Sequence, residues 1–397
     1  MGGRASSRRL SDENVVIIDA LRTPVGKLLG RLSALSAPGL ASFVIKELAS
    51  RAGRPGIDEV IMGNVLSAGI GQNPARQAAM AAGLPYGVSA VTVNMVCASG
   101  LMAVAMAFDR LRLHEADVII AGGMESMTNA PFLLKDMRKG RRTGDAVAID
   151  SMVCDGLWDC YYDAHMGSLC ELTAGRYGIT RQEQDAFALW SHKKAQRAES
   201  TGAFKDEMVP VQVDGETVAT DETIRWDTSI GKIKRLRPVF KEHGAITAGN
   251  APGLNDGAAA LLLTTAGYAE RKGLKPIAEI IAYSTGHVDP KWYTVAPVKS
   301  VKKLLAKTGL EIGDFDLVEE NEAFAAQTLA VIKELSLDPG RVNVNGGAIA
   351  LGHPIGASGA RILTTLVHAL KKRRKNLGLS TLCLGGGGAV SMAVRSV

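Results

Sequence analysis

A cysteine stands where an apolar, strand-like run gives way to small residues that open a helix. Residues 91–100 read VTVNMVCASG, and Cys97 lies at this junction. The start of a helix presents the positive end of its dipole and free backbone amides, and both favour a thiolate. These features indicate a nucleophile, although a lone cysteine at such a place can also be a buried structural residue.

Three further residues could supply acid–base and electrostatic chemistry. His353 lies in the glycine-rich loop GHPIGASG and could act as a general base. Cys383 ends the run LSTLCL and precedes four glycines, which expose backbone amides to a ligand. Asn321 follows the run DLVEE, at the strand end where ligands collect in α/β sheets. Taken singly, the histidine could be a loop residue without function, and Cys383 a core residue.

Brought into one cleft, these four side chains would form a reaction centre. Cys97 would be the nucleophile, His353 its base, Cys383 a second thiol for proton transfer, and Asn321 an amide for an oxyanion. This combination suits acyl transfer through a thioester. The glycines after Cys383 lack the spacing of a dinucleotide-binding loop, so that class of site is disfavoured.

The elements that must position these residues occur twice in the chain. Residues 37–53 resemble 296–309, and CASG at 97–100 resembles GASG at 356–359. Three further pairs follow the same order: DEVIMGN with DLVEEN, VTVN with VNVN, and DVIIAGGMESM with LSTLCLGGGGAVSM. Five ordered matches indicate an internal duplication rather than a chance likeness of segments rich in alanine and glycine. One copy supplies the cysteine and the other supplies the histidine.

Alternating apolar runs and amphipathic segments predict an α/β fold. We expect strands at 14–20, 57–66, 91–96 and 116–123, and helices at 37–52, 72–84 and 98–114. Unbroken apolar strands joined by helices predict a largely parallel sheet that is covered on both faces.

The chain divides into two duplicated halves and an insertion. We expect a first half at 14–124 plus 250–275, an inserted loop domain at 125–249, and a second half at 276–397. Within the insertion, Thr180 and Glu183 form a capping-box pattern that predicts the start of a helix.

Composition narrows the class of protein. The 397 residues are 46% hydrophobic and 22% charged with a formal net charge of +6, as in an ordinary globular enzyme. Without a basic stripe interleaved with aromatics, nucleic-acid binding is not expected. The basic stretch 225–238 would instead suit an anionic small molecule, or be a solvated loop. No apolar run approaches the roughly 20 residues that span a bilayer.

The cysteines and the N-terminus bear on location. Five irregularly spaced cysteines argue against a disulfide framework and for a reducing compartment. Cys154, Cys160 and Cys170 flank His165 at spacings that match no common zinc pattern, so no metal is expected. The first nine residues carry three arginines without a following apolar segment, which fits a short arm or a targeting remnant rather than a secretory signal. We therefore expect a cytoplasmic protein.

Eight motifs resemble those of the thiolase family, over the chain from about residue 14 to its end. Within the family, the sequence is most similar to the biosynthetic, acetoacetyl-CoA-forming acetyltransferases. The motifs are RTPVGK at 22–27, GQNPARQAA at 71–79, NMVCASG at 94–100, AGGMESM at 121–127, TAGNAPGLNDGAA at 247–259, NEAFAAQ at 321–327, NVNGGAIALGHPIGASG at 343–359 and CLGGGG at 383–388.

The resemblance implies a role for each candidate residue. Cys97 resembles the nucleophile that becomes acetylated, and His353 resembles the base that activates it. Cys383 resembles the residue that deprotonates the methyl group of a second acetyl-CoA. Asn321 is similar to the residue that holds a water, which with His353 forms one oxyanion hole. The amides of Cys97 and Gly385 resemble the second hole.

Further positions match substrate contacts of the family. His165 and Met166 match the pocket wall that keeps the acyl group short. Arg225 matches an arginine that contacts CoA, and Phe324 an aromatic residue near the pantetheine.

Three positions depart from the family pattern and bear on the substrate range. Pro252, after Ala251, stands where many members have a serine that contacts CoA, so one polar contact is missing. Lys232 replaces a common serine and could restore a contact. The stretch WYTVAP at 292–297 differs from the usual glycine-containing segment beside the acyl pocket.

The resemblance also implies a fold and a reaction. It implies five layers, αβαβα, built from two βαβαβαββ halves with an inserted loop domain, assembled as a homotetramer. The implied reaction is a ping-pong Claisen condensation of two acetyl-CoA to acetoacetyl-CoA and CoA, without a permanently bound cofactor. Three alternatives remain: a degradative 3-ketoacyl-CoA thiolase of broader chain length, a condensing enzyme acting on a carrier protein, and a non-catalytic scaffold.

Overall fold

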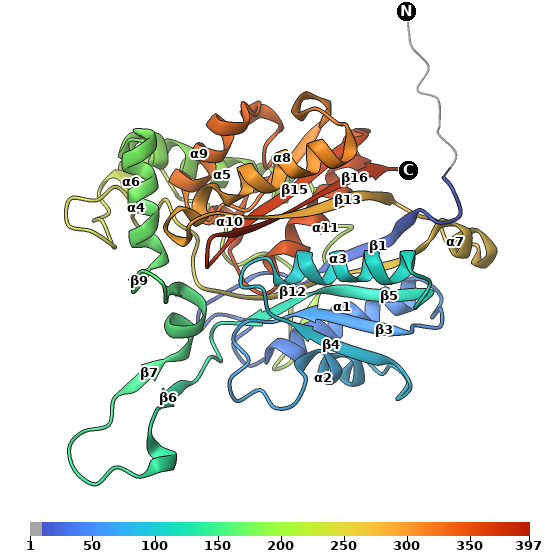
Figure 1. Cartoon of the computed structure of the whole chain (residues 1–397), viewed down its shortest axis with the longest axis horizontal. Coiled ribbons are helices and arrows are strands. Elements are labelled where there is room, and N and C mark those ends of the chain that lie inside the picture. Colours follow the sequence, from blue (N-terminus) through green and yellow to red (C-terminus); the bar gives the residue numbers. More distant parts are fainter. Residues whose placement is uncertain (1–9) are drawn as a thin grey trace, which may run out of the picture.

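A mixed sheet runs through both halves of the chain (Figure 1). The computed structural model describes residues 10–397, so the predicted arm or targeting remnant at 1–9 lies outside the described residues. The strands of the first half are β1 (Val15–Arg22), β2 (Gly26–Lys27), β3 (Glu59–Gly63), β4 (Ser89–Val93), β5 (Val118–Ser126) and β12 (Asn255–Thr265). Those of the second half are β13 (Ala278–His287), β14 (Leu317–Glu320), β15 (Leu377–Leu384) and β16 (Gly388–Ser396). They form one ten-stranded sheet in the order β14-β15-β16-β13-β1-β12-β5-β3-β4, with β2 paired to β12.

The prediction of a largely parallel sheet is wrong. Within the described sheet, parallel pairing is confined to β3·β4, β3·β5 and β14·β15. Strand β12 lies antiparallel between β1 and β5, and β16 lies antiparallel between β13 and β15. The reason lies in the connections, because β16 follows β15 through a short glycine turn, and a short turn can join only antiparallel strands.

The duplication predicted from the sequence is visible in the strand order. The run β5-β12-β1 of the first half corresponds to β15-β16-β13 of the second. Helix α1 (Ala37–Arg51) corresponds to α8 (Ala296–Thr308), as the matched segments indicated. The counterpart of β4 is reduced to a single bridge between Val318 and Val342. Next to that bridge, the side chain of Asn343 pairs with the backbone N–H and C=O of Glu320 in place of a strand.

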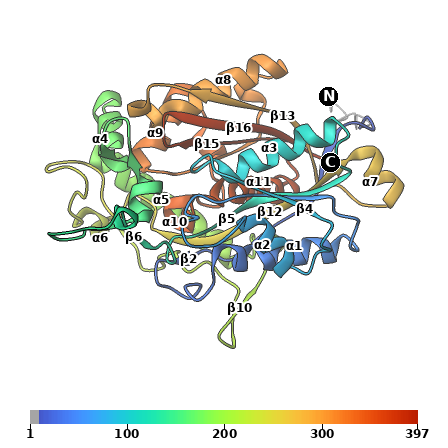
Figure 2. The same ribbon diagram turned by 60° about the horizontal axis from the view of Figure 1, so that its bottom comes forward.

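The helices complete five layers, αβαβα. Helices α3 (Ser99–Arg112) and α11 (Ser358–Arg373) lie between the two parts of the sheet (Figure 2). Helices α1 and α2 (Pro74–Ala81) cover one outer face, and α8 and α9 (Ala325–Leu335) cover the other. Glycines bring the two central helices together, since a Cβ at Gly359 would lie 2.5 Å from the backbone nitrogen of Leu101. The loops that precede both helices are thereby forced into proximity.

The inserted segment carries smaller elements. Its hairpins are β6 (Phe132–Leu134) with β7 (Ala148–Asp150), β8 (Trp158–Asp159) with β9 (Ala164–His165), and β10 (Val211–Val213) with β11 (Glu216–Val218). Its helices are α4 (Met166–Tyr177), α5 (Arg181–Ser200) and α6 (Ile230–Lys234), and the predicted capping box starts α5. The remaining helices are α7 (Ala266–Lys272) and the short α10 (Ala348–Leu351). The β6-β7 hairpin projects far from the layered body (Figure 1).

Two findings bear on the wider predictions. No helix in residues 10–397 is long and apolar enough to cross a membrane. Within the same residues, no group of three or more His, Cys, Asp or Glu side chains is arranged to hold a metal ion. The boundaries given for the two halves and the insertion stay predictions.

Candidate active site

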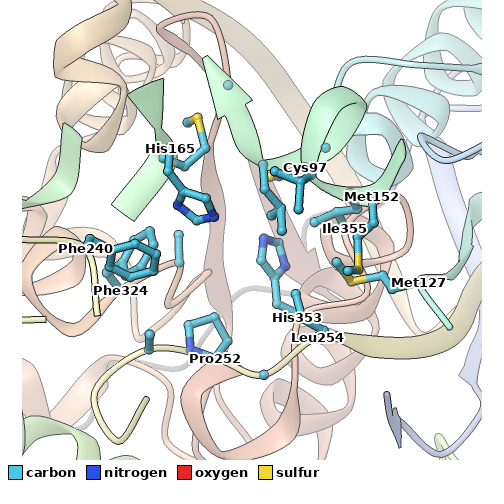
Figure 3. A pocket seen from close by; sticks show the side chains of 18 of the residues that line it. Cys97, Met127, Met152, His165, Phe240, Pro252, Leu254, Phe324, His353 and Ile355 are labelled. Carbon is cyan, nitrogen blue, oxygen red and sulfur yellow. The ribbon is translucent and has the colours of Figure 1, made fainter. Parts of the chain in front are cut away.

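Residues from both halves and from the insertion enclose one cavity of about 410 Å³. Cys97, His353, Cys383 and Gly385 all line it, as the sequence led us to expect. Figure 3 shows the ring of His353 beside Cys97, with His165, Phe240 and Phe324 on the other side of the cavity. Predicted contacts that also line the cavity are His165, Met166, Ala251, Pro252 and Phe324.

A strained turn presents Cys97 to the cavity. The preceding Val96 has a φ of 48°, which is unusual for a β-branched residue. Its N–H donates to Oδ1 of Asn94 at 3.0 Å, and its C=O accepts from the hydroxyl of Ser99 at 2.6 Å. The helix itself begins at Ser99, two residues beyond the sulfur. The backbone turn that carries Cys97 is therefore fixed before the helix starts.

Burial outweighs the helix-start features that favour a thiolate at Cys97. Burial raises the pKa of the Cys97 thiol to about 12, and the amides of Cys97 and Gly385 only partly oppose this shift. Desolvation penalises the charged form more strongly than a helix N-terminus favours it. Cys97 therefore rests as a thiol and needs a base when it reacts.

His353 is suited to be that base. Its Nδ1 lies 2.6 Å from the hydroxyl of Ser358, which itself donates to the carbonyl of Pro354 at 2.9 Å. Because the hydroxyl has only one hydrogen, the ring must carry its hydrogen on Nδ1 and leave Nε2 with a free lone pair. Burial, together with the charge of Arg361, lowers the pKa of His353 to about 3. The backbone N–H of His353 is fixed by Oδ1 of Asn255 at 2.9 Å.

Asn321 lies beside His353, and Cys383 lines the same cavity as Cys97 and His353. Nδ2 of Asn321 is 3.5 Å from Nε2 of His353. Oδ1 of Asn321 is buried without a partner among the described residues, so it can accept a hydrogen bond from a water or a ligand. Cys383 is buried at the end of β15, and burial raises the pKa of its thiol well above the ordinary value. A negative charge on Cys97 or on Glu320 would raise this pKa further.

The glycine loop after β15 brings an amide to the sulfur of Cys97. The N–H groups of Gly385 and of Cys97 itself are the backbone donors that act on this thiol. A Cβ at Gly385 would lie 3.5 Å from Cγ1 of Val96 and 3.8 Å from Cε of Met166. Two amides aimed at one sulfur form a donor pair that can stabilise an oxyanion on a carbonyl attacked there.

Aromatic residues brace the wall opposite Cys97. The ring of His165 stacks on Phe240 with centroids 4.6 Å apart, and Phe240 meets Phe324 edge-on at 6.0 Å. The hydroxyl of Tyr293 donates to the carbonyl of Met166 at 2.9 Å. No sequence pattern predicted a role for Phe240 or Tyr293, although Tyr293 lies in WYTVAP at 292–297, a departure from the family pattern.

The structure does not bring two predicted CoA contacts to the cavity. Among the described residues that line it, neither Arg225 nor Lys232 is present. Lys232 forms an ion pair with Asp227 on the surface. The backbone N–H of Arg225 donates to Nδ1 of His192 at 3.4 Å, which anchors the basic stretch to α5.

Comparisons with known proteins support the family resemblance. The family models of the thiolase N-terminal and C-terminal domains match residues 15–267 and 274–396. A probable acetyl-CoA acetyltransferase of Escherichia coli is 50% identical over 389 residues, covering 96% of this chain and 99% of that protein. An acetyl-CoA acetyltransferase of Pseudomonas aeruginosa is 49% identical over 389 residues, with the same coverage.

A solved structure extends the likeness to the fold. The crystal structure of the Bacillus anthracis acetyl-CoA acetyltransferase superposes with a TM-score of 0.94 at 40% identity, and covers 97% of this chain and 99% of that one. The predicted family and fold are thus confirmed, and the chain belongs to the thiolase family.

Proposed function

We propose that this protein catalyses the reversible condensation of two acetyl-CoA molecules to acetoacetyl-CoA and CoA. The observation that carries the proposal is the single cavity shared by Cys97, His353 and Cys383. A thiol, a neutral imidazole and a second thiol are the groups that a ping-pong acyl transfer with carbon–carbon bond formation needs. The relatives named above carry the same activity in their names.

The first half-reaction acetylates Cys97. Nε2 of His353 takes the thiol proton as the sulfur attacks the acetyl carbonyl, since the free lone pair lies on that nitrogen. The amides of Cys97 and Gly385 stabilise the oxyanion. Collapse of the tetrahedral intermediate breaks the bond to CoA, whose sulfur takes a proton from Cys383. The enzyme then holds an acetyl thioester on Cys97, a protonated His353 and a Cys383 thiolate.

The second half-reaction forms the carbon–carbon bond. The Cys383 thiolate takes a methyl proton from the second acetyl-CoA. Protonated His353 donates a hydrogen bond from Nε2 to the enolate oxygen. Nδ2 of Asn321 lies 3.5 Å from this Nε2. The enolate carbon attacks the acetyl group, acetoacetyl-CoA leaves, and the Cys97 sulfur regains its proton from His353. Every group returns to its starting state, so no cofactor is consumed.

A degradative 3-ketoacyl-CoA thiolase with a broader chain-length range is the second candidate. The cavity beyond Cys97 is lined by apolar side chains that a longer acyl chain could contact, namely Met127, Met152, Leu157 and Ile355. The wall of His165, Phe240 and Met166, which Tyr293 braces, favours a short acyl group instead. The short-chain function is therefore preferred.

Other properties of the family are proposed with this function. CoA thioesters are the partners, no cofactor is held permanently, and the chain assembles as a homotetramer in the cytoplasm. Arg225 and Lys232 stay candidates for CoA contact, since the basic stretch 225–238 lies next to Val239 and Phe240, which line the cavity.

Thiolysis of 3-ketoacyl-CoA substrates of increasing chain length tests the proposal. We expect cleavage confined to the four-carbon substrate, and its loss in Cys97→Ala. Cleavage of longer chains at equal or higher kcat/KM would favour the degradative enzyme. Failure to cleave any of them would reopen the carrier-protein and scaffold alternatives.

A further inference from the structure

Glu125, at the end of β5, has a fully buried carboxylate whose four partners are all hydrogen-bond donors. Its Oε1 accepts from Nδ2 of Asn64 at 2.7 Å and from the N–H of Leu66 at 3.2 Å. Its Oε2 accepts from the N–H of Val65 at 3.1 Å and from the N–H of Gly356 at 2.9 Å. Three donors belong to the first half of the chain, and the fourth belongs to the loop that carries His353.

The loop approaches β5 so closely that only glycine fits. A Cβ at Gly356 would lie 2.8 Å from Oε2 of Glu125 and 2.7 Å from the carbonyl of Met124. A Cβ at Gly123 would lie 2.1 Å from the carbonyl of Gly356. The loop that carries His353 therefore packs tightly against the end of β5, and the Glu125 carboxylate is part of this contact.

A shift of Gly356 would reach the imidazole. The N–H groups of Ala357 and Ser358 both donate to the carbonyl of Pro354 at 2.9 Å, so residues 354–358 form one tight turn. Ser358 is the residue that fixes Nδ1 of His353. Movement of this turn would therefore move the base and its orienting hydroxyl together.

Two other donors of the same carboxylate, Val65 and Leu66, belong to segments that pack against the nucleophile. Val65, Leu66 and Ile355 belong to one apolar cluster, and Cys97 packs against it. One carboxylate thus contacts both the segment that packs against Cys97 and the loop that carries His353.

We propose that Glu125 is a positioning residue, a clasp that holds the His353 loop at reaction distance from Cys97. This proposal rests on the proposed function. The ionised form of Glu125 is the form that holds the loop. All four neighbours donate, so a proton on either oxygen would face a donor and break part of the clasp. Glu125 does not line the cavity, and it therefore has no direct contact with substrate there.

Protonation of the Glu125 carboxylate would lower kcat at acid pH, which gives the pH profile of kcat an acid limb. Burial raises the pKa of Glu125 to about 7, against the lowering effect of the amides of Leu66, Val65 and Gly356. The titratable groups that act with it are Asp256 on β12, whose charge raises this pKa, and Cys97, whose pKa Glu125 raises in turn. We therefore expect kcat to rise with pH through about 7.

The raised pKa of Glu125 affects stability in the opposite direction to kcat. The pKa is above the ordinary value of 4.5, so the stabilising contribution of this group is full below pH 4.5 and is lost as the pH rises through about 7. Burial alone produces this fall in stability, so the rise of kcat over the same pH range is the observation that distinguishes a positioning residue from a structural one.

Glu125→Gln tests the clasp. The amide oxygen of glutamine can still accept hydrogen bonds, but its N–H₂ group would face donors that now bond to the second carboxylate oxygen. We expect kcat of acetoacetyl-CoA thiolysis to fall by about 10- to 100-fold, the effect of misplacing a catalytic group by about 1 Å. KM and the thermal midpoint should change little, and the acid limb near pH 7 should disappear. Glu59→Gln is the matched control, a buried carboxylate at the far end of β3 paired with Arg110.

Asn64→Ala keeps the test decisive if Glu125→Gln does not fold. Removal of one of the four donors should move the acid limb to higher pH, while kcat on its plateau stays within about threefold of wild type. Unchanged kcat and an unchanged acid limb in both variants would overturn the proposal. A loss of kcat explained wholly by a lower thermal midpoint would also overturn it.

Alkylation of Cys97 by iodoacetamide separates this proposal from the proposed function. The reaction needs no CoA substrate, and it is faster when the base beside the thiol can take the thiol proton. If wild-type protein cleaves no 3-ketoacyl-CoA, the proposed function fails. A slower alkylation in Glu125→Gln than in Glu59→Gln would still support the clasp, and equal rates would overturn it.

Discussion

The hydroxyl of Ser358 lies 2.6 Å from Nδ1 of His353 and donates its only hydrogen to Pro354. This relationship decides which ring nitrogen can act as the base, because it holds the hydrogen on Nδ1. The imidazole is neutral, and its lone pair on Nε2 is available to the thiol of Cys97.

Ser358→Ala should lower kcat by about tenfold, which corresponds to roughly 1.4 kcal/mol of transition-state stabilisation. Without the hydroxyl, the ring can adopt the other tautomer and lose its base at Nε2. Steady-state thiolysis of acetoacetyl-CoA measures the effect. Ser300→Ala is the control, since this buried serine bonds to Ser284 away from the cavity. Equal kcat in both variants would contradict the assigned tautomer.

The resting state of Cys97 predicts a pH profile for its alkylation. A thiol with a pKa of about 12 beside a histidine with a pKa of about 3 is not a preformed ion pair. The rate of alkylation by iodoacetamide should rise steadily between pH 6 and 9. A plateau across that range would instead indicate a thiolate already formed at pH 6. Loss of the labelled peptide in Cys97→Ala confirms the site.

Phe240→Ala should widen the range of acyl chains. The ring stacks on His165 at 4.6 Å and meets Phe324 at 6.0 Å, so its removal takes away the brace of the wall. We expect the kcat/KM ratio of six-carbon to four-carbon substrate to rise by at least threefold. Trp190→Ala, on the surface of α5, provides a control for the loss of an aromatic ring. An unchanged ratio would place the chain-length limit elsewhere.

Arg22→Met should destabilise the fold by about 3–5 kcal/mol, the cost of leaving buried carboxylates without their cation. Arg22 is fully buried and pairs with Glu207 at 2.6 Å and Asp221 at 2.8 Å, and these partners raise its pKa. The bonds tie the insertion to β1. Equilibrium unfolding in urea measures the change. Glu47→Gln, which removes an exposed pair with Arg51, should cost no more than about 0.5 kcal/mol.

Local features of the fold were predictable because neighbouring residues determine them. The capping box at Thr180 and Glu183 starts α5 as expected, and the repeated segments form corresponding helices. The direction of β12 was not predictable, because it depends on the path of a long insertion. Strand β12 lies antiparallel between β1 and β5, and residues 127–254, which separate β5 from β12 in the sequence, determine that direction.

The supporting residues of the site were mostly missed, yet one carried a signal. Ser99 and Ser358 occupy the same place in the repeats CASG and GASG. Both hydroxyls donate to a backbone carbonyl of the preceding turn, Val96 at 2.6 Å and Pro354 at 2.9 Å. Their equivalence in the duplication could have identified Ser358. Glu125 lies in the motif AGGMESM, but the motif does not show its hydrogen-bond partners, and Phe240 lies in no motif. The partners of both residues come from distant segments.

The sequence by itself determined the family, the duplication and the residues that meet in the cavity, because short motifs at strand ends carry them. Only the tertiary structure decided their protonation states and supports. Burial by segments far apart in the chain makes Cys97 a thiol and His353 a neutral imidazole. The same packing leaves Lys232 paired with Asp227 rather than lining the cavity. Desolvation and ion pairing depend on which groups from distant segments surround a side chain, and these neighbours cannot be read from the local sequence.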